Sequence, residues 1–86
     1  MERIDRIRSL LEQRFDPVQL DLEDQSHLHA GHAGARDGKG HFKVVITAEA
    51  FRDKTKLQQH RLVYETLDDM LQTDIHALII EAHSPE

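Results

Sequence analysis

Histidine is the residue type in this sequence that could carry out chemistry. The 86-residue chain contains seven histidines and no cysteine, and protonation of all seven would reverse its formal net charge of −5. Neutral imidazole is a common ligand of transition metals and also a proton donor or acceptor near neutral pH. Four of the histidines and all four glycines lie within residues 27–41, namely His27, His29, His32 and His41 with Gly31, Gly34, Gly38 and Gly40.

The spacing of these histidines is compatible with ligation but does not define a metal motif. His27 and His29 would point the same way in an extended chain, and His29 and His32 would do so in a turn. Neither spacing matches a regular zinc-binding signature. Two interpretations therefore stay open. The segment is a solvated, histidine-rich loop, or at least one of its imidazoles binds a metal or a cluster.

His60 is a separate candidate, because it lies on an expected helix. It follows Leu57 by three residues and precedes Tyr64 by four, so we expect it on the apolar stripe of that helix. Lys56, Arg61 and the positive end of the helix dipole would favour the neutral ring, which is the form that binds metal. His60 is thus either a half-buried core histidine or a metal ligand.

The remaining polar groups do not indicate catalysis. We expect His76 and His83 to flank the last strand as an edge residue and a surface residue, and we assign them no role. Glu65, Asp68 and Asp69 are typical of a solvated helix face. No nucleophile–base arrangement, phosphate-binding loop or carboxylate pair is evident in the sequence. We therefore expect a protein that is not an enzyme.

A second candidate surface is basic and could contact nucleic acid. It consists of Arg52, Lys54, Lys56 and Arg61, which cluster around the expected start of the second helix. Proteins that bind nucleic acid strongly through counterion release are normally basic overall, whereas this chain has a net charge of −5. We expect binding that is independent of nucleotide sequence to be weak.

Hydrophobic periodicity predicts the elements that must position these residues. Apolar residues at spacings of three and four predict a helix over residues 2–15, which should end at Asp16 because a proline follows. Alternation predicts a strand over 18–24. Residues 25–41 show no hydrophobic periodicity, so we expect them to form a flexible loop. The β-rich composition of residues 42–48 predicts a second strand, more buried than the first.

The second half of the chain predicts one helix and one strand. Thr55 and Gln58 form the sequence signature of a capping box, so a helix should begin near Lys56 and fade around residues 73–74. An apolar run then predicts a last strand over 77–82. The order α-β-β-α-β implies an α+β fold. Its small three-stranded mixed sheet has an antiparallel first pair, a parallel second pair and both helices on one face.

Composition limits the class of protein. The length fits a single domain over residues 1–86, with 84–86 as a short tail. The absence of cysteine excludes disulfides and any cluster held wholly by this chain's own thiolates. No apolar run approaches the length of a membrane span, and the first residues do not resemble a signal peptide. We expect a soluble protein in the cytoplasm, with no membrane partner.

Several segments together resemble the BolA family. They are LEDQSHLHAGHAG at 22–34, GHFKVVI at 40–46, Phe51, QHRLVYETL at 59–67 and IHAL at 75–78, in the order and spacing of that family. The resemblance covers nearly the whole chain. It departs at Gln25, where the family usually has glutamate, so a charged role for that position is in doubt.

The resemblance implies a class II KH-like fold and a shared [2Fe-2S] cluster. In this arrangement a monothiol glutaredoxin and glutathione supply thiolates, and the BolA-like partner supplies the helix histidine, matched by His60, together with a loop residue. Counting back from the His41-Phe42 pair favours His32, whereas counting forward from Asp24 favours His29, and we prefer His32. Because protons compete with iron for imidazole, the histidine-ligated form should be lost below roughly pH 6.

The resemblance leaves a second function open. Some BolA-like proteins are DNA-binding transcriptional regulators, for which the basic cluster at residues 52–61 would supply the contact. The leading expectation is a non-enzymatic partner in iron–sulfur cluster trafficking or iron sensing. We expect the free protein to be a monomer or a weak homodimer.

Overall fold

The computed structural model describes residues 2–25 and 40–85, and it confirms the expected α+β fold. The order of elements is α1 (Arg3–Phe15), β1 (Gln19–Asp24), β2 (Gly40–Thr47), η3 (Glu49–Phe51), α2 (Lys56–Thr66), α3 (Asp68–Thr73) and β3 (Ile75–His83). The short 3₁₀ helix η3 was not predicted. Most of the predicted loop lies outside the described residues, but Gly40 and His41, which we assigned to that loop, belong to β2.

The first helix forms as its pattern predicts. Ile7, Leu11 and Phe15 recur every four residues and are buried on the side that faces the sheet. The helix ends at Asp16, which adopts a left-handed conformation with φ 45°. The Asp16 N–H donates to the carbonyl of Glu12 at 3.1 Å, which closes the last turn.

The three strands form one mixed sheet in the order β1-β2-β3. β1 and β2 are antiparallel, and β2 and β3 are parallel, as the crossover through the helices requires. Phe42, Val44 and Ile46 alternate along β2 on the buried face of the sheet. Leu20 and Leu22 of β1 pair with Ile46 and Val44, so they lie on the same face.

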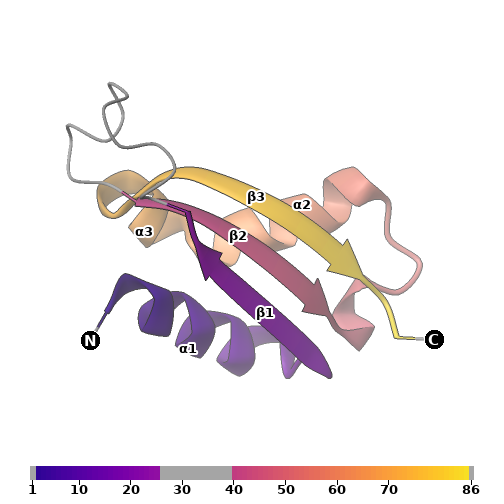
Figure 1. The fold of residues 1–86 in the computed structure, drawn as a ribbon. Coiled ribbons are helices and arrows are strands. Elements are labelled where there is room, and N and C mark those ends of the chain that lie inside the picture. Colours follow the sequence, from indigo (N-terminus) through magenta and orange to yellow (C-terminus); the bar gives the residue numbers. More distant parts are fainter. Residues whose placement is uncertain (1, 26–39, 86) are drawn as a thin grey trace.

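All the helices pack on that buried face. Figure 1 shows α1 alongside β1, with α2 and α3 passing behind β2 and β3. One hydrophobic core joins them, and its members are Ile7, Leu11, Phe15, Phe42, Val44, Ile46, Ala48, Phe51, Val63, Leu67, Met70, Ile75, Ile80 and Ala82. Within this core the rings of Phe15 and Phe51 are 5.0 Å apart. The other face of the sheet is covered by none of the described helices.

The second helix differs from its prediction in two respects. It is not continuous, because α2 ends at Thr66 and α3 begins at Asp68 after a turn at Leu67. The Thr66 hydroxyl donates to the Leu62 carbonyl at 2.8 Å, and such bonds commonly bend helices. The apolar stripe is also shifted, since Leu57 is 61% exposed and Tyr64 is 42% exposed.

The buried side of these helices consists of Gln59, Val63, Leu67 and Met70. The capping box predicted at the start of α2 is confirmed. Thr55 accepts from the Gln58 N–H at 3.1 Å, and the Gln58 side chain accepts from the Thr55 N–H at 2.9 Å. Within the described residues, no helix is long and apolar enough to cross a membrane.

Candidate functional site

His76 lies in an irregularity of the sheet. Gly40 of β2 pairs with Ile75 of β3, and the next residue, His41, pairs with Ala77. One residue of β3, His76, is therefore extra. We expected His76 and His83 to flank the last strand, but both lie inside β3. A β-bulge re-aims the side chain of the extra residue, and such bulges are frequent beside functional sites.

The bulge places His76 beside His41. The two imidazole rings have centroids 5.2 Å apart and planes inclined at 51°. His41 is 7% exposed, whereas His76 is exposed to solvent. The two rings are therefore in contact, and both ring nitrogens of His41 are buried. Of the two imidazoles, that of His76 is the one exposed to a ligand from solution.

Backbone hydrogen bonds fix this end of the sheet. The Gln25 N–H donates to the His41 carbonyl at 2.7 Å, and the Gly40 N–H donates to the Asp74 carbonyl at 2.9 Å. Gln25 and Gly40 are the residues that bracket segment 26–39. The histidine pair therefore lies where both ends of that segment are anchored. His29 and His32, the loop candidates, lie outside the described residues.

An ion-pair cluster ties the same end of the sheet to α1. The Asp74 carboxylate, which precedes β3, accepts from the Arg6 guanidinium at 2.7 Å and lies 3.8 Å from that of Arg3. Asp74 thus links α1 through its side chain to β2 through its carbonyl. This linkage fixes the chain immediately before the bulge residue His76.

His60 lies elsewhere, on α2 and one turn after the capping box. Its side chain is half-buried, and it forms no hydrogen bond or ion pair with any described residue. Among the described residues, no hydrogen bond, ion pair or ring contact joins His60 to His76. The shifted apolar stripe places His60 at the border of the buried face rather than at its centre. The structure thus brings His76, which carried no assigned role, beside His41, which belongs to the candidate segment 27–41.

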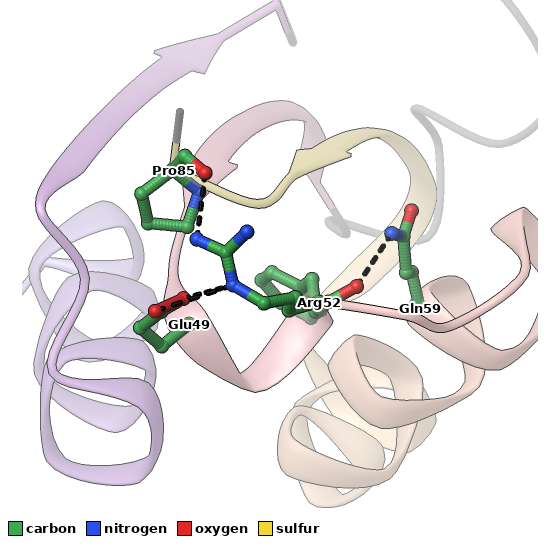
Figure 2. A network of polar contacts seen from close by, with 5 residues as sticks. Glu49, Arg52, Gln59 and Pro85 are labelled. Atoms are coloured by element: carbon green, nitrogen blue, oxygen red, sulfur yellow. Dashed lines mark hydrogen bonds and ion pairs between the residues drawn. The ribbon is translucent and has the colours of Figure 1, made fainter.

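The basic cluster is partly occupied by internal contacts. Figure 2 shows Arg52 between the Glu49 carboxylate, at 2.7 Å and 3.2 Å, and the carbonyl of Pro85, at 2.8 Å. The hydrogen bond that Arg52 donates to the Glu49 carboxylate, and then the negative charge of Glu49, raise the pKa of Arg52. The Lys56 ammonium donates to the Ala82 carbonyl at 3.1 Å. Two of the four predicted nucleic-acid contacts therefore bond to oxygen atoms of the protein itself.

Lys54 and Arg61 are the other two cations of the cluster. They line one open hollow of about 250 Å³ together with Gln58, Leu62 and Glu65. A second hollow of about 300 Å³ is also lined by Arg61 and Glu65, with Tyr64 and Asp68. Carboxylates thus lie beside both hollows. The surface is mixed in charge rather than strongly basic, which does not favour phosphate binding.

Gln59 is a buried polar residue that the sequence analysis did not single out. It is 7% exposed, and its Nε2 donates to the Phe51 carbonyl at 3.0 Å, as Figure 2 shows. This bond joins α2 to the last residue of η3. The Gln59 Oε1 has no hydrogen-bond partner among the described residues. Its role is therefore structural, because it fixes the first turns of α2.

Together these features define a small α+β domain with a three-stranded mixed sheet, helices on one face and a histidine pair at a β-bulge. Comparison with known families assigns this class. The family model described as BolA-like protein matches residues 11–86, and the chain belongs to the BolA family. The resemblance seen in the sequence is thus confirmed. His76 lies in the IHAL segment at 75–78, which is one of the segments that carry this resemblance. That segment was the sequence feature that could have marked His76 as a candidate.

Individual relatives support this assignment. The chain is 46% identical over 85 residues to "SufE-like protein 1, chloroplastic/mitochondrial" of Arabidopsis thaliana, covering 93% of this chain and 23% of that protein. It is 36% identical to "DNA-binding transcriptional regulator BolA" of Escherichia coli, covering 93% and 73%. The chain spans about half or less of the first relatives it matches, including 54% of "Protein BOLA1, chloroplastic".

Solved structures show the same fold. The "BolA domain of SufE1 from Arabidopsis thaliana" superposes with a TM-score of 0.88 at 42% identity, covering 99% of this chain and 94% of that one. "BolA1 from Arabidopsis thaliana" gives a TM-score of 0.85 at 35% identity, with the same coverage. Both likenesses extend over nearly the whole of both chains.

Proposed function

We propose that this protein is a non-enzymatic partner in iron–sulfur cluster trafficking or iron sensing, and that it shares a [2Fe-2S] cluster with a monothiol glutaredoxin. The glutaredoxin and glutathione would supply thiolates, and this chain would supply imidazoles. The observation that supports the proposal is the position of His76, an exposed histidine at a β-bulge beside the anchored ends of segment 26–39.

The donor set of the chain fits this role. Because the chain has no cysteine, it can contribute to a cluster through imidazole or carboxylate but not through thiolate. [2Fe-2S] clusters with two histidine ligands on one iron and two cysteine ligands on the other are known, and their reduction potentials lie above those of all-thiolate clusters. A subunit that brings histidines to a partner's thiolates completes such a set.

The geometry favours His76 over His60 as the fixed ligand. His76 is exposed, is re-aimed by the bulge and lies beside the residues that bracket segment 26–39, which contains His29 and His32. His60, the ligand expected from the resemblance, is half-buried on α2 and forms no hydrogen bond, ion pair or ring contact with His76. We therefore propose His76 with His32 or His29 as ligands, and His60 as the competing assignment.

The proposal is tested by mixing the protein with a cluster-loaded monothiol glutaredoxin and following the visible circular dichroism spectrum. Wild type should give a new spectrum, because imidazole replaces a ligand of the glutaredoxin homodimer cluster. His76→Ala should weaken this change. The matched control is His83→Ala, since His83 is exposed at the other end of the same strand and should behave as wild type. An unchanged spectrum on mixing wild type would contradict the proposal.

A DNA-binding regulator is the second candidate function, because two bacterial relatives, of Escherichia coli and Haemophilus influenzae, are named as such. Lys54 and Arg61 would carry the contact here. A salt-dependent mobility-shift assay separates the two functions. Nanomolar binding at physiological salt that is abolished by Lys54→Glu would favour the regulator, and its absence would favour cluster sharing.

A further inference from the structure

The outer edge of β3 is an open strand edge. The sheet order places β3 at one end, and no strand in the described part of the chain pairs with its far side. Unpaired edges offer backbone donors and acceptors to another strand, and natural proteins usually block them. Among the described residues, the bulge at His76 and the Lys56 ammonium on the Ala82 carbonyl lie toward the two ends of this far side of β3.

The direction of the backbone groups between these two points follows from two hydrogen bonds. The His83 carbonyl accepts from the Ala48 N–H at 3.0 Å, on the side of β2. The preceding carbonyl, of Ala82, accepts from Lys56 on the far side. Because backbone groups alternate along a strand, those of Leu78 and Ile80 also point to the far side. The open part of the edge therefore centres on Ile79.

Ile79 is also the exposed apolar side chain of this strand. It is 51% exposed and pairs with Lys43 on the face of the sheet opposite the helices. Its neighbours Leu78 and Ile80 point to the core. An exposed isoleucine at the centre of an unblocked edge is typical of a surface that pairs with another strand.

We propose that a second copy of this chain occupies this edge, pairing antiparallel through β3. In the two-fold arrangement centred on Ile79, Leu78 of each copy faces Ile80 of the other and exchanges backbone hydrogen bonds with it. The two Ile79 side chains then lie directly opposite each other, where side chains approach closely, and each covers the exposed surface of the other. The sheets of the two copies become continuous.

Self-pairing is favoured because the window is self-complementary. In a two-fold interface each residue of one copy lies opposite a defined residue of the other copy. Here Ile79 lies opposite Ile79, and Glu81 lies opposite Ala77. No like charges face each other within residues 77–81. Lys56 and the bulge limit the paired length to this short window, so the dimer buries far less than the roughly 1,200 Å² of a stable complex and should be weak.

The proposal is tested by sedimentation equilibrium over a range of protein concentrations. Wild type should populate a dimer as concentration rises. Ile79→Lys should weaken dimerisation by about tenfold or more, because two ammonium groups would meet at the centre. The matched control is Leu57→Lys, which changes an equally exposed apolar residue on α2 and should leave dimerisation unchanged. Circular dichroism verifies that both variants are folded.

Amide hydrogen exchange gives a second measurement. The Leu78 and Ile80 amides should become protected as concentration rises, while their counterparts in Ile79→Lys should not. A wild type that stays monomeric throughout, or equal effects of Ile79→Lys and Leu57→Lys, would overturn the proposal. The proposal would also be overturned if these amides became protected only when a different extended peptide is added. The edge of β3 would then pair with another protein and not with a second copy of this chain.

Discussion

The imidazole rings of His41 and His76 lie with centroids 5.2 Å apart, although the two residues are 35 positions apart in the sequence. His41 lies on β2 and His76 lies on β3, and the parallel pairing of these strands brings the two residues close. His76 is the extra residue at the bulge, and its side chain lies beside His41. The Asp74 carbonyl, bonded to the Gly40 N–H, holds the entry to β3 in place. The bulge thus sets the exposed His76 ring against the buried His41 ring at one end of the sheet.

The proposed site predicts a dependence on pH. Unperturbed imidazole has a pKa near ~6.5, and its protonated form cannot bind iron. As pH falls through roughly 6, protons should displace the histidine ligands, and the cluster should return to all-thiolate ligation on the glutaredoxin. Visible circular dichroism at a series of pH values checks this. A heterocomplex spectrum that persists unchanged to pH 5, with both proteins folded, would contradict histidine ligation.

The internal contacts of the basic cluster predict that DNA binding is weak and uses about two phosphate contacts rather than four. Arg52 and Lys56 are engaged by carbonyl or carboxylate oxygens, which leaves Lys54 and Arg61 to contact phosphate. Two phosphate contacts give a slope of log affinity against log salt of about −2, compared with nearly −4 for four contacts. Fluorescence anisotropy with a short duplex measures the slope, and Arg8→Glu, an exposed change on α1, serves as control. A slope near −4 would refute this limit.

The capping box predicts a measurable contribution to stability. Thr55→Ala removes the acceptor of the Gln58 N–H and should lower the free energy of unfolding by about 1 kcal/mol. Urea denaturation measures this change. The control is Thr73→Ala at the end of α3, which removes no N-terminal cap and should change stability by about 0.5 kcal/mol or less. Equal losses in the two variants would show that the cap does not stabilise α2.

Local patterns in the sequence predicted most of the fold. The spacing of Ile7, Leu11 and Phe15 predicted α1, the alternation of Leu20 and Leu22 predicted β1, and the capping box predicted the start of α2. These features depend on neighbouring residues alone, and each forms as expected. The mixed topology followed from the order of elements, because a strand–helix–strand connection in one sheet is almost always a right-handed crossover.

The candidate site was less predictable, because it depends on strand register. Nothing in the periodicity around His76 signals a bulge, which arises only when β3 pairs with β2. The apolar stripe of the second helix was also misplaced. Leu57 and Tyr64 have the spacing of a buried face, but both are exposed, and Gln59 and Val63 occupy the buried side of α2 instead. His60 therefore seemed more central from the sequence than it is.

The central claim is that His76 is a cluster ligand, and one measurement tests it most directly. The protein, labelled with ¹⁵N at its histidines, is assembled with an unlabelled cluster-loaded glutaredoxin, reduced, and examined by pulsed electron paramagnetic resonance. Wild type and His60→Ala should show strong ¹⁵N coupling from directly bound imidazole, and His76→Ala should lose at least one such coupling. Full coupling in His76→Ala together with its loss in His60→Ala would contradict the account and assign the ligand to α2.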